Sequence, residues 1–294
     1  MSHFVQQQHT VNAFSSSDSW VILSPIEQSI KQKIEAVGVP LKDWDIQINY
    51  GIKTGCNEAF IINTDKRNEI LANCKDEAER KRTEELIRPI LRGRDIKRYG
   101  YNWAGLWLIN THNGIKGRIP RIDINDYPAV KAHLDQYWDK ISKRADKGDT
   151  PYNLRNCAYM EDFDKPKIIY PNMTKYMPFA FDKEMYLTNQ KCFIITGKFM
   201  AYLTAFFNSA LFKYCFRDSF PELQGGTREL SKIFFDKIPI YEVSDVQNLQ
   251  FYDAIEDIQK EYTKQKALRI DSMLFDLYDL TDEERRAIGY FEIQ

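Results

Sequence analysis

The sequence changes character at residues 44–62, which read WDIQINYGIKTGCNEAFII. Residues 45–50 alternate polar and apolar side chains, residues 59–62 are continuously apolar, and Gly51 and Gly55 lie between the two runs. A period of two is typical of a half-buried strand, and glycine between apolar runs marks a turn. The stretch therefore predicts a β-hairpin with a polar tip.

Helices and short strands follow one another without regular β-α alternation in the rest of the chain. The best helix start is Ser24-Pro25-Ile26-Glu27, a capping box with proline at the first helical position. This mixture predicts an α+β fold: a mixed β-sheet with short strands and polar loops, followed by a helical C-terminal segment. The expected helices are 24–37, 76–85, 127–144 and 199–216, and the expected strands are 106–109, 167–171 and 192–195.

Charge and composition divide the chain into three parts. Residues 1–23 are polar and serine-rich, which predicts a linker from an upstream segment. Residues 242–294 hold 6 Lys and Arg against 13 Asp and Glu, a net charge of −7, so residues 1–241 hold 35 against 29, a net charge of +6. We expect a binding domain over residues 24–241 and a helical segment over residues 242–294. This segment packs either against a neighbour or on the domain's own core.

Several protein classes are disfavoured by composition. No stretch approaches the roughly 18 uncharged apolar residues that cross a membrane, and the N-terminus lacks the pattern of a signal peptide. The five cysteines are scattered without a C-x-x-C pair, which argues against disulfides and a zinc site. We expect a cytoplasmic protein with reduced thiols, no membrane contact and no bound metal.

Catalytic motifs are also missing. Neither a glycine-rich turn for S-adenosylmethionine nor an Asn-Pro-Pro-Tyr type of loop occurs, so methyl transfer within this chain is not expected. The string Asp164-Lys165-Pro166-Lys167 contains the residue types of a Mg²⁺-dependent nuclease, and a stand-alone nuclease is one alternative function. A second alternative is a protein-interaction module that acts through the acidic helices. We expect no catalytic residue in the chain.

Polar, basic loops between the strands are the features that indicate DNA binding. Lysine and arginine suit phosphates, whereas Thr, Asn, Gln and some cations suit base edges. Glycine allows close approach of the backbone, and a helix start after residue 228 would receive a phosphate. The expected contacts are Lys53, Thr54, Asn57, Arg92, Arg94, Lys97, Arg98, Asn113, Lys116, Arg118, Asn172, Lys175, Gln224, Gly225, Gly226, Thr227 and Arg228.

Within this set, two roles are separated. Phosphate contacts are expected from Lys53, Arg92, Arg94, Lys97, Arg98 and Arg228, and base readout from Thr54, Asn57, Asn113, Lys116, Arg118, Asn172, Gln224 and Thr227. A purely structural role is open for each loop. Thr54-Gly55 and Asn113-Gly114 are also ordinary turn signals, and the arginines of residues 92–94 have Glu84, Glu85 and Asp95 as possible ion-pair partners.

Taken together and in order, the motifs resemble the TaqI-like C-terminal specificity domain of type IIG and related adenine-specific restriction-modification methyltransferases. The matching strings are GIKTGCNEAFII (51–62), ILRGRDIKRY (90–99), KPKIIYP (165–171), YLTAFFNS (202–209), GGTR (225–228), KIP (237–239) and residues 270–284. The resemblance implies sequence-specific recognition of double-stranded DNA. It also implies a methyltransferase domain or subunit as partner, with S-adenosylmethionine bound there and no cofactor in this chain.

Overall fold

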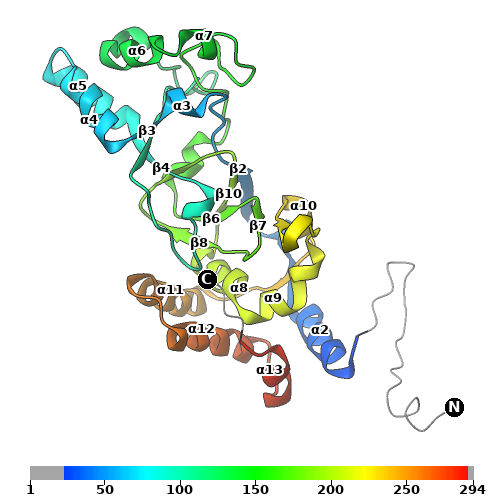
Figure 1. The fold of residues 1–294 in the computed structure, drawn as a ribbon. Helices are drawn as coiled ribbons and strands as arrows, with labels where there is room; N and C mark the ends of the chain where they lie inside the picture. Colours follow the sequence, from blue (N-terminus) through cyan, green and yellow to red (C-terminus); the bar gives the residue numbers. More distant parts are fainter. Residues whose placement is uncertain (1–22, 291–294) are drawn as a thin grey trace.

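The computed structural model describes residues 23–290, and Figure 1 shows several small sheets between two groups of helices. Helix α2 (Pro25–Val37) confirms the first predicted element. Its capping box is formed, since the Ser24 amide donates to Glu27 Oε2 at 2.7 Å and the Glu27 amide donates to Ser24 Oγ at 3.3 Å. The helix ends where β1 (Gly38–Pro40) pairs with β12 (Pro239–Tyr241), so the two ends of the predicted domain lie side by side.

A four-stranded antiparallel sheet separates two hydrophobic cores. Its order is β2 (Ile46–Tyr50), β10 (Cys192–Gly197), β6 (Lys167–Pro171) and β8 (Ala180–Asp182). Successive residues of β6 face opposite cores: Ile168 and Tyr170 belong to one, and Ile169 belongs to the other. The strand is buried along its whole length, which explains its continuous apolar run.

The predicted hairpin over residues 45–62 is wrong. Strand β2 pairs with β10, with Ile48 opposite Ile195, and residues 57–60 form a helical turn, α3 (Asn57–Phe60). Ala59 and Phe60 are fully buried there. A short apolar run does not distinguish a strand from a buried helical turn, so the local pattern was ambiguous.

A second four-stranded sheet includes the strand that directly follows this turn. Its order is β3 (Ile61–Asn63), β5 (Leu106–Ile109), β4 (Ile87–Leu91) and β9 (Leu187–Thr188). Strand β5, predicted at residues 106–109, is confirmed, and β4 and β9 run parallel. The helices next to it are α4 (Thr64–Ala72), α5 (Glu77–Leu86), α6 (Pro128–Asp135) and α7 (Trp138–Ile141). The charged helix at residues 76–85 is thus confirmed, whereas the helix expected at residues 127–144 is two shorter ones.

The apolar helix expected at residues 199–216 is interrupted by a cap. Helix α8 (Met200–Asn208) is buried on all sides, and α9 (Ala210–Phe216) starts anew after Ser209. The Ser209 backbone is extended, with φ −72° and ψ 158°, and its Oγ accepts the Phe212 amide at 3.0 Å. Further on lie β11 (Arg228–Glu229), paired with β7 (Met173–Thr174), and α10 (Lys232–Phe235).

The C-terminal segment is helical, as predicted, and packs on the same core as α2 and α8. Phe251, Ile258 and Leu274 are buried in that core. Figure 1 shows these helices together at one end of the molecule, with α4–α7 at the opposite end. The C-terminal helices are α11 (Asp245–Lys260), α12 (Lys264–Leu277) and α13 (Asp282–Ile288). The boundary at residue 241 stays a prediction, and the linker expected at residues 1–23 lies almost wholly outside the described residues. None of the helices described is long and apolar enough to cross a membrane.

Glu284 of α13 accepts hydrogen bonds from α2. Its replacement is expected to change how the free energy of unfolding depends on pH. Its carboxylate accepts Ser29 Oγ at 2.6 Å and Lys33 Nζ at 2.8 Å. Burial alone would raise the pKa of Glu284, but hydrogen bonds from Lys33, Ser29 and the Thr281 amide outweigh it and lower the pKa to about 2 from 4.5. Glu284→Gln should therefore cost about 1–2 kcal/mol of unfolding free energy at pH 7.

The sign of this effect follows from linkage. Because the folded pKa of Glu284 is depressed, its stabilisation is present above pH 4.5 and is lost as the pH falls toward 2. Urea unfolding of the wild type and Glu284→Gln should give free energies of unfolding whose difference is largest between pH 5 and 7, is smaller at pH 3 and approaches zero near pH 2. A difference that is constant across this range would contradict the assignment.

Candidate nucleic-acid interface

A groove of about 630 Å³ lies where the turn after β4 approaches the ends of β6 and β9. Its walls come from three segments that are far apart in the sequence: residues 92–97, 171–178 and 189–191. The residues that line it are Arg92, Gly93, Arg94, Ile96, Lys97, Pro171, Asn172, Met173, Thr174, Tyr176, Pro178, Asn189 and Lys191. The groove thus brings together four of the predicted contacts, Arg92, Arg94, Lys97 and Asn172.

The first wall is held in shape by Asp95. Its carboxylate accepts the Arg92 amide at 2.8 Å, Arg92 Nε at 3.0 Å and Arg92 Nη2 at 2.8 Å. The hydrogen bond to Asp95 raises the pKa of Arg92. The guanidinium of Arg92 is thus held by hydrogen bonds within the turn. Gly93 meets the next wall closely, since a Cβ there would lie 3.3 Å from Pro171 Cβ. Arg94 and Lys97 are exposed and form no ion pair with any residue of 23–290.

The groove is positively charged. Arg92, Arg94, Lys97 and Lys191 line it, and no carboxylate is among the lining residues that the structure describes. Lys191 was not predicted, because it stands alone in the polar turn between β9 and β10 and has no basic neighbour in sequence. The charge of Arg92 is balanced by Asp95, so Arg94, Lys97 and Lys191 supply the net positive charge. A concave surface with several uncompensated cations attracts polyanions such as nucleic acid.

The opposite wall carries uncharged polar groups and an aromatic ring. Thr174 Oγ1 accepts the amides of Tyr176 and Met177, both at 3.1 Å, and so shapes the loop after β7. The Tyr176 side chain is 51% exposed, and Lys175 Nζ lies 5.9 Å from the centre of its ring. The predicted residue Lys175 is exposed beside the groove and does not line it.

Arg98 does not line the groove and lacks the exposed position that its predicted phosphate contact requires, so this placement is corrected. Its side chain is buried, and its guanidinium donates to the Asn208 carbonyl oxygen at 2.9 and 3.2 Å and to the Tyr262 hydroxyl at 3.1 Å. These partners lie on α8 and at the end of α11. Arg98 therefore ties the groove segment to the C-terminal helices, while its neighbour Lys97 faces the groove.

Residues 224–228 reach the groove only through the β7–β11 pair, in which Arg228 lies opposite Thr174. The Arg228 side chain is buried and donates to the Phe220 carbonyl oxygen, Asp218 and Glu222, so its predicted phosphate contact is also corrected. Gly225 and Gly226 have φ of 75° and 77°, and a Cβ on either would meet no atom within 4 Å. The backbone conformation requires these glycines, and the space above them is open. The helix start expected after residue 228 is only the short α10.

Gln224 is exposed and Thr227 is partly exposed on this loop. Neither side chain lines the groove. Their predicted role in base readout stays a prediction.

The loop at residues 53–57 is folded on itself. Thr54 is 2% exposed and donates from Oγ1 to Asn57 Oδ1 at 2.5 Å, so the prediction that it reads bases is corrected to a structural role. Lys53 Nζ lies 5.2 Å from the centre of the Tyr50 ring. The loop is near the groove only at its start, where Ile52 pairs with Asn189.

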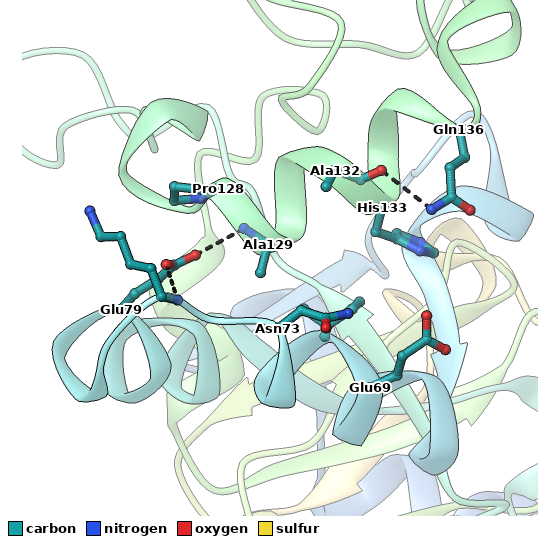
Figure 2. Close-up of a pocket in the computed structure, with 10 residues that line it drawn as sticks. Glu69, Asn73, Glu79, Pro128, Ala129, Ala132, His133 and Gln136 are labelled. Carbon is teal, nitrogen blue, oxygen red and sulfur yellow. Dashed lines mark hydrogen bonds between the residues drawn. The ribbon is translucent and has the colours of Figure 1, made fainter.

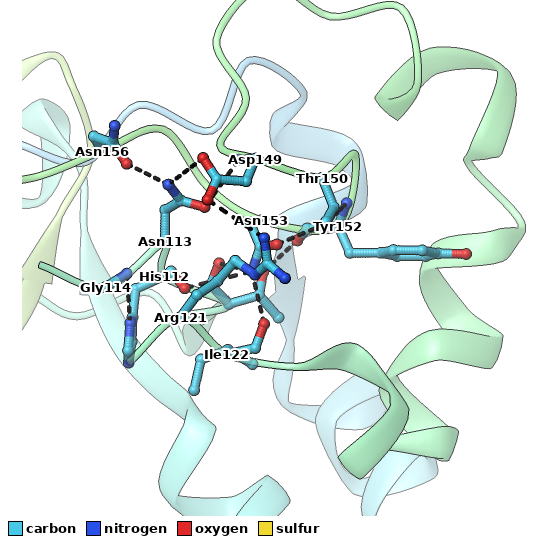
Figure 3. A network of polar contacts seen from close by, with 11 residues as sticks. His112, Asn113, Gly114, Arg121, Ile122, Asp149, Thr150, Tyr152, Asn153 and Asn156 are labelled. Carbon is cyan, nitrogen blue, oxygen red and sulfur yellow. Dashed lines mark hydrogen bonds and ion pairs between the residues drawn. The ribbon is translucent and has the colours of Figure 1, made fainter. Parts of the chain in front are cut away.

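The loop at residues 113–118 is held by a separate polar network, shown in Figure 3. Asn113 Nδ2 donates to Asp149 Oδ1 at 3.1 Å and to Asn156, and Asn113 Oδ1 accepts the Asp149 amide at 2.9 Å. Both ends of the Asn113 amide are used within the protein, and its predicted base contact stays a prediction. Arg118 pairs with Glu161, and Lys116 is exposed. None of these three residues lines the groove.

A smaller cavity of about 260 Å³ lies between α4, α5 and α6 and contains none of the predicted residues (Figure 2). Glu79 reaches from α5 to cap α6, accepting the Ala129 amide at 2.9 Å and the Lys75 amide at 2.9 Å. His133 Nε2 lies 2.9 Å from the Ala59 carbonyl oxygen, and burial lowers its pKa. Carboxylates and cations are mixed around this cavity, so it does not resemble a polyanion site.

The residues considered for a nuclease are placed unsuitably for that chemistry. Lys167 is fully buried, and its Nζ donates to Asp182 Oδ2 at 2.6 Å and to the Phe163 carbonyl oxygen at 2.8 Å. Burial lowers the pKa of Lys167, although Asp182 opposes this effect. A lysine enclosed in this way cannot reach a water molecule at a surface scissile bond.

A family model described as the TaqI-like C-terminal specificity domain matches residues 88–240, a little over half of the chain. The chain belongs to this family. Every residue that lines the groove falls inside the matched part of the specificity domain, whereas the loop at residues 53–57 lies outside it. The sequence resemblance to this family is thereby confirmed.

Known proteins similar to this specificity domain are restriction-modification proteins. The type II methyltransferase M.PaeR7I of Pseudomonas aeruginosa is 20% identical over 280 residues, covering 94% of this chain and 45% of that protein. The chain thus spans less than half the length of this relative.

Two solved structures have a similar fold. One is the type IIL restriction-modification enzyme MmeI, determined in complex with DNA, with a TM-score of 0.54, 12% identity and coverage of 82% of this chain and 34% of that one. The other is the type IIG restriction endonuclease BpuSI, with a TM-score of 0.54, 14% identity and coverage of 87% and 33%. At these identities the likeness shows the fold alone.

Proposed function

We propose that this specificity domain binds double-stranded DNA sequence-specifically and does so through the groove between residues 92–97, 171–178 and 189–191. The observation that carries the proposal is the set of cations along the groove, Arg94, Lys97 and Lys191, with no carboxylate among the lining residues of 23–290. Cations of this kind bind phosphates, and the uncharged side chains of the opposite wall suit base edges. Membership of a specificity-domain family supports the same conclusion.

We further propose that the chain serves an N6-adenine DNA methyltransferase of a restriction-modification system and is not catalytic itself. The DNA methyltransferase motifs absent from this sequence would then lie in another domain or subunit, which would bind S-adenosylmethionine. The support is that the methyltransferase relative is more than twice as long as the region it shares with this chain.

The test is selection of duplexes from a randomised pool by the full chain, followed by titration of the selected duplex against a scrambled one. Affinity for the selected duplex is expected to exceed that for the scrambled duplex on the order of 1,000-fold at physiological salt. Equal, salt-dependent binding of both would contradict sequence recognition. No binding even at low salt would contradict the proposal altogether and favour a protein-interaction module.

A further inference from the structure

Two amide side chains line the groove, and they differ in how they are used. Asn189 Oδ1 accepts the Lys191 amide at 3.1 Å and so shapes the turn. Asn172 Oδ1 is buried and has no hydrogen-bond partner among the described residues. The backbone polar groups of Asn172 are paired without its side chain. The backbone N–H donates to the Lys191 carbonyl oxygen at 2.8 Å, and the backbone carbonyl accepts the Leu230 N–H at 2.8 Å.

An unpartnered buried acceptor costs folding free energy, and a native protein seldom keeps one without a use. The Asn172 backbone is fixed on both sides, by the turn before β10 and by Leu230. The amide itself rotates about the Cβ–Cγ bond without moving this backbone. The Asn172 backbone is therefore fixed in the wall of the groove, and rotation of the amide would turn the buried Oδ1 toward the groove, where the side chain would present a donor and an acceptor.

The chemistry around Asn172 indicates what it would meet there. Arg94, Lys97 and Lys191 lie along the same groove and suit the phosphates of a duplex. The Asn172 amide is uncharged and lies among cations that suit phosphates, so we expect it to meet a base edge. An amide matches adenine, whose major-groove edge presents the N6 amino donor next to the N7 acceptor, whereas guanine presents two acceptors there.

We infer that Asn172 is a specificity-determining residue that reads one adenine of the recognised sequence through N6 and N7. The inference rests on the proposed function, and it selects, among the predicted base-reading residues, the one that lines the groove and whose buried side-chain oxygen has no partner among the described residues. Asn113 and Thr54 use their side-chain polar groups in intramolecular hydrogen bonds and do not line the groove.

The experiment compares duplexes selected from a randomised pool by the full-length wild type, Asn172→Ala, Asn172→Asp and the control Gln190→Ala. Gln190 is exposed in the adjacent turn and does not line the groove. Asn172→Ala is expected to lose the preference for adenine at one position, a discrimination of about 5- to 150-fold, with other positions unchanged. Asn172→Asp, which keeps only acceptors, should shift that position toward cytosine, whose N4 is a donor.

The outcomes separate the two proposals. If the wild type selects a sequence and both Asn172 variants select the same one with equal discrimination, Asn172 does not read a base, and the proposed function stands. If the wild type selects no sequence, the proposed function itself fails. Thermal unfolding of both variants checks that they are folded. If alanine destabilises the loop, the aspartate variant, which has nearly the same shape as asparagine, still tests the inference.

Discussion

Replacing Arg94, Lys97 and Lys191 together by alanine is expected to weaken duplex binding on the order of 100-fold or more at 0.1 M salt. Each cation that neutralises a phosphate releases a counterion, so the slope of log affinity against log salt should decrease by about 2.7 for three contacts. The loss should be similar for the selected and the scrambled duplex, because phosphate contacts carry no sequence information. Fluorescence anisotropy titrations at several salt concentrations measure both quantities.

A matched control removes the same charge elsewhere. Lys260, Lys264 and Arg269 are exposed on the C-terminal helices α11 and α12, and their triple alanine variant should bind nearly as the wild type does. If both triple variants lose affinity equally, only net charge matters, and the groove is not the binding surface.

The Lys167→Ala variant is expected to lose about 3–5 kcal/mol of unfolding free energy. The replacement leaves Asp182 buried without its cation, and an uncompensated buried charge is strongly destabilising. Asp182 also accepts the Tyr101 hydroxyl at 3.1 Å and the amides of Glu184 and Tyr186, so the loss should loosen the edge of the central sheet. Urea unfolding monitored by circular dichroism gives the free energy.

Lys165 is the control for Lys167. It lies two residues earlier, its side chain is 59% exposed, and it pairs with Asp162 at 2.7 Å. Lys165→Ala should change stability by less than about 1 kcal/mol, because the Lys165 ammonium is solvated and the largely buried Asp162 keeps its hydrogen bond from Asn49 Nδ2 at 3.2 Å. Equal effects of the two variants would show that the Lys167–Asp182 pair does not hold the sheet.

The elements that were predicted correctly are those specified by short-range signals. The capping box at Ser24 and the apolar spacing of the C-terminal helices involve residues within one or two helical turns. The hairpin failed because the partner of β2 is β10, which lies more than 140 residues later. The break between α8 and α9 depends on one serine cap, which the apolar periodicity around it concealed.

The same limit applies to the site. Arg94 and Lys97 were predicted from local composition, but their neighbour Arg98 was predicted with them, and its burial depends on Asn208 and Tyr262. Arg228 is covered by Asp218 and Glu222 in a similar way. The positions of Lys191 and Asn172 in the groove depend on contacts among three segments that are far apart in the sequence, so local sequence patterns do not predict them.

Site-specific photocrosslinking determines directly whether the groove is the surface that holds DNA. A photoreactive phenylalanine analogue replaces Tyr176 on the groove wall in one protein and Leu249, 59% exposed on α11, in another. We predict that the protein with the analogue at position 176 crosslinks to the selected duplex and that the one with it at position 249 does not. Crosslinking at position 249 with none at 176, while both proteins bind the duplex normally, would show that DNA lies on the C-terminal helices and not in the groove.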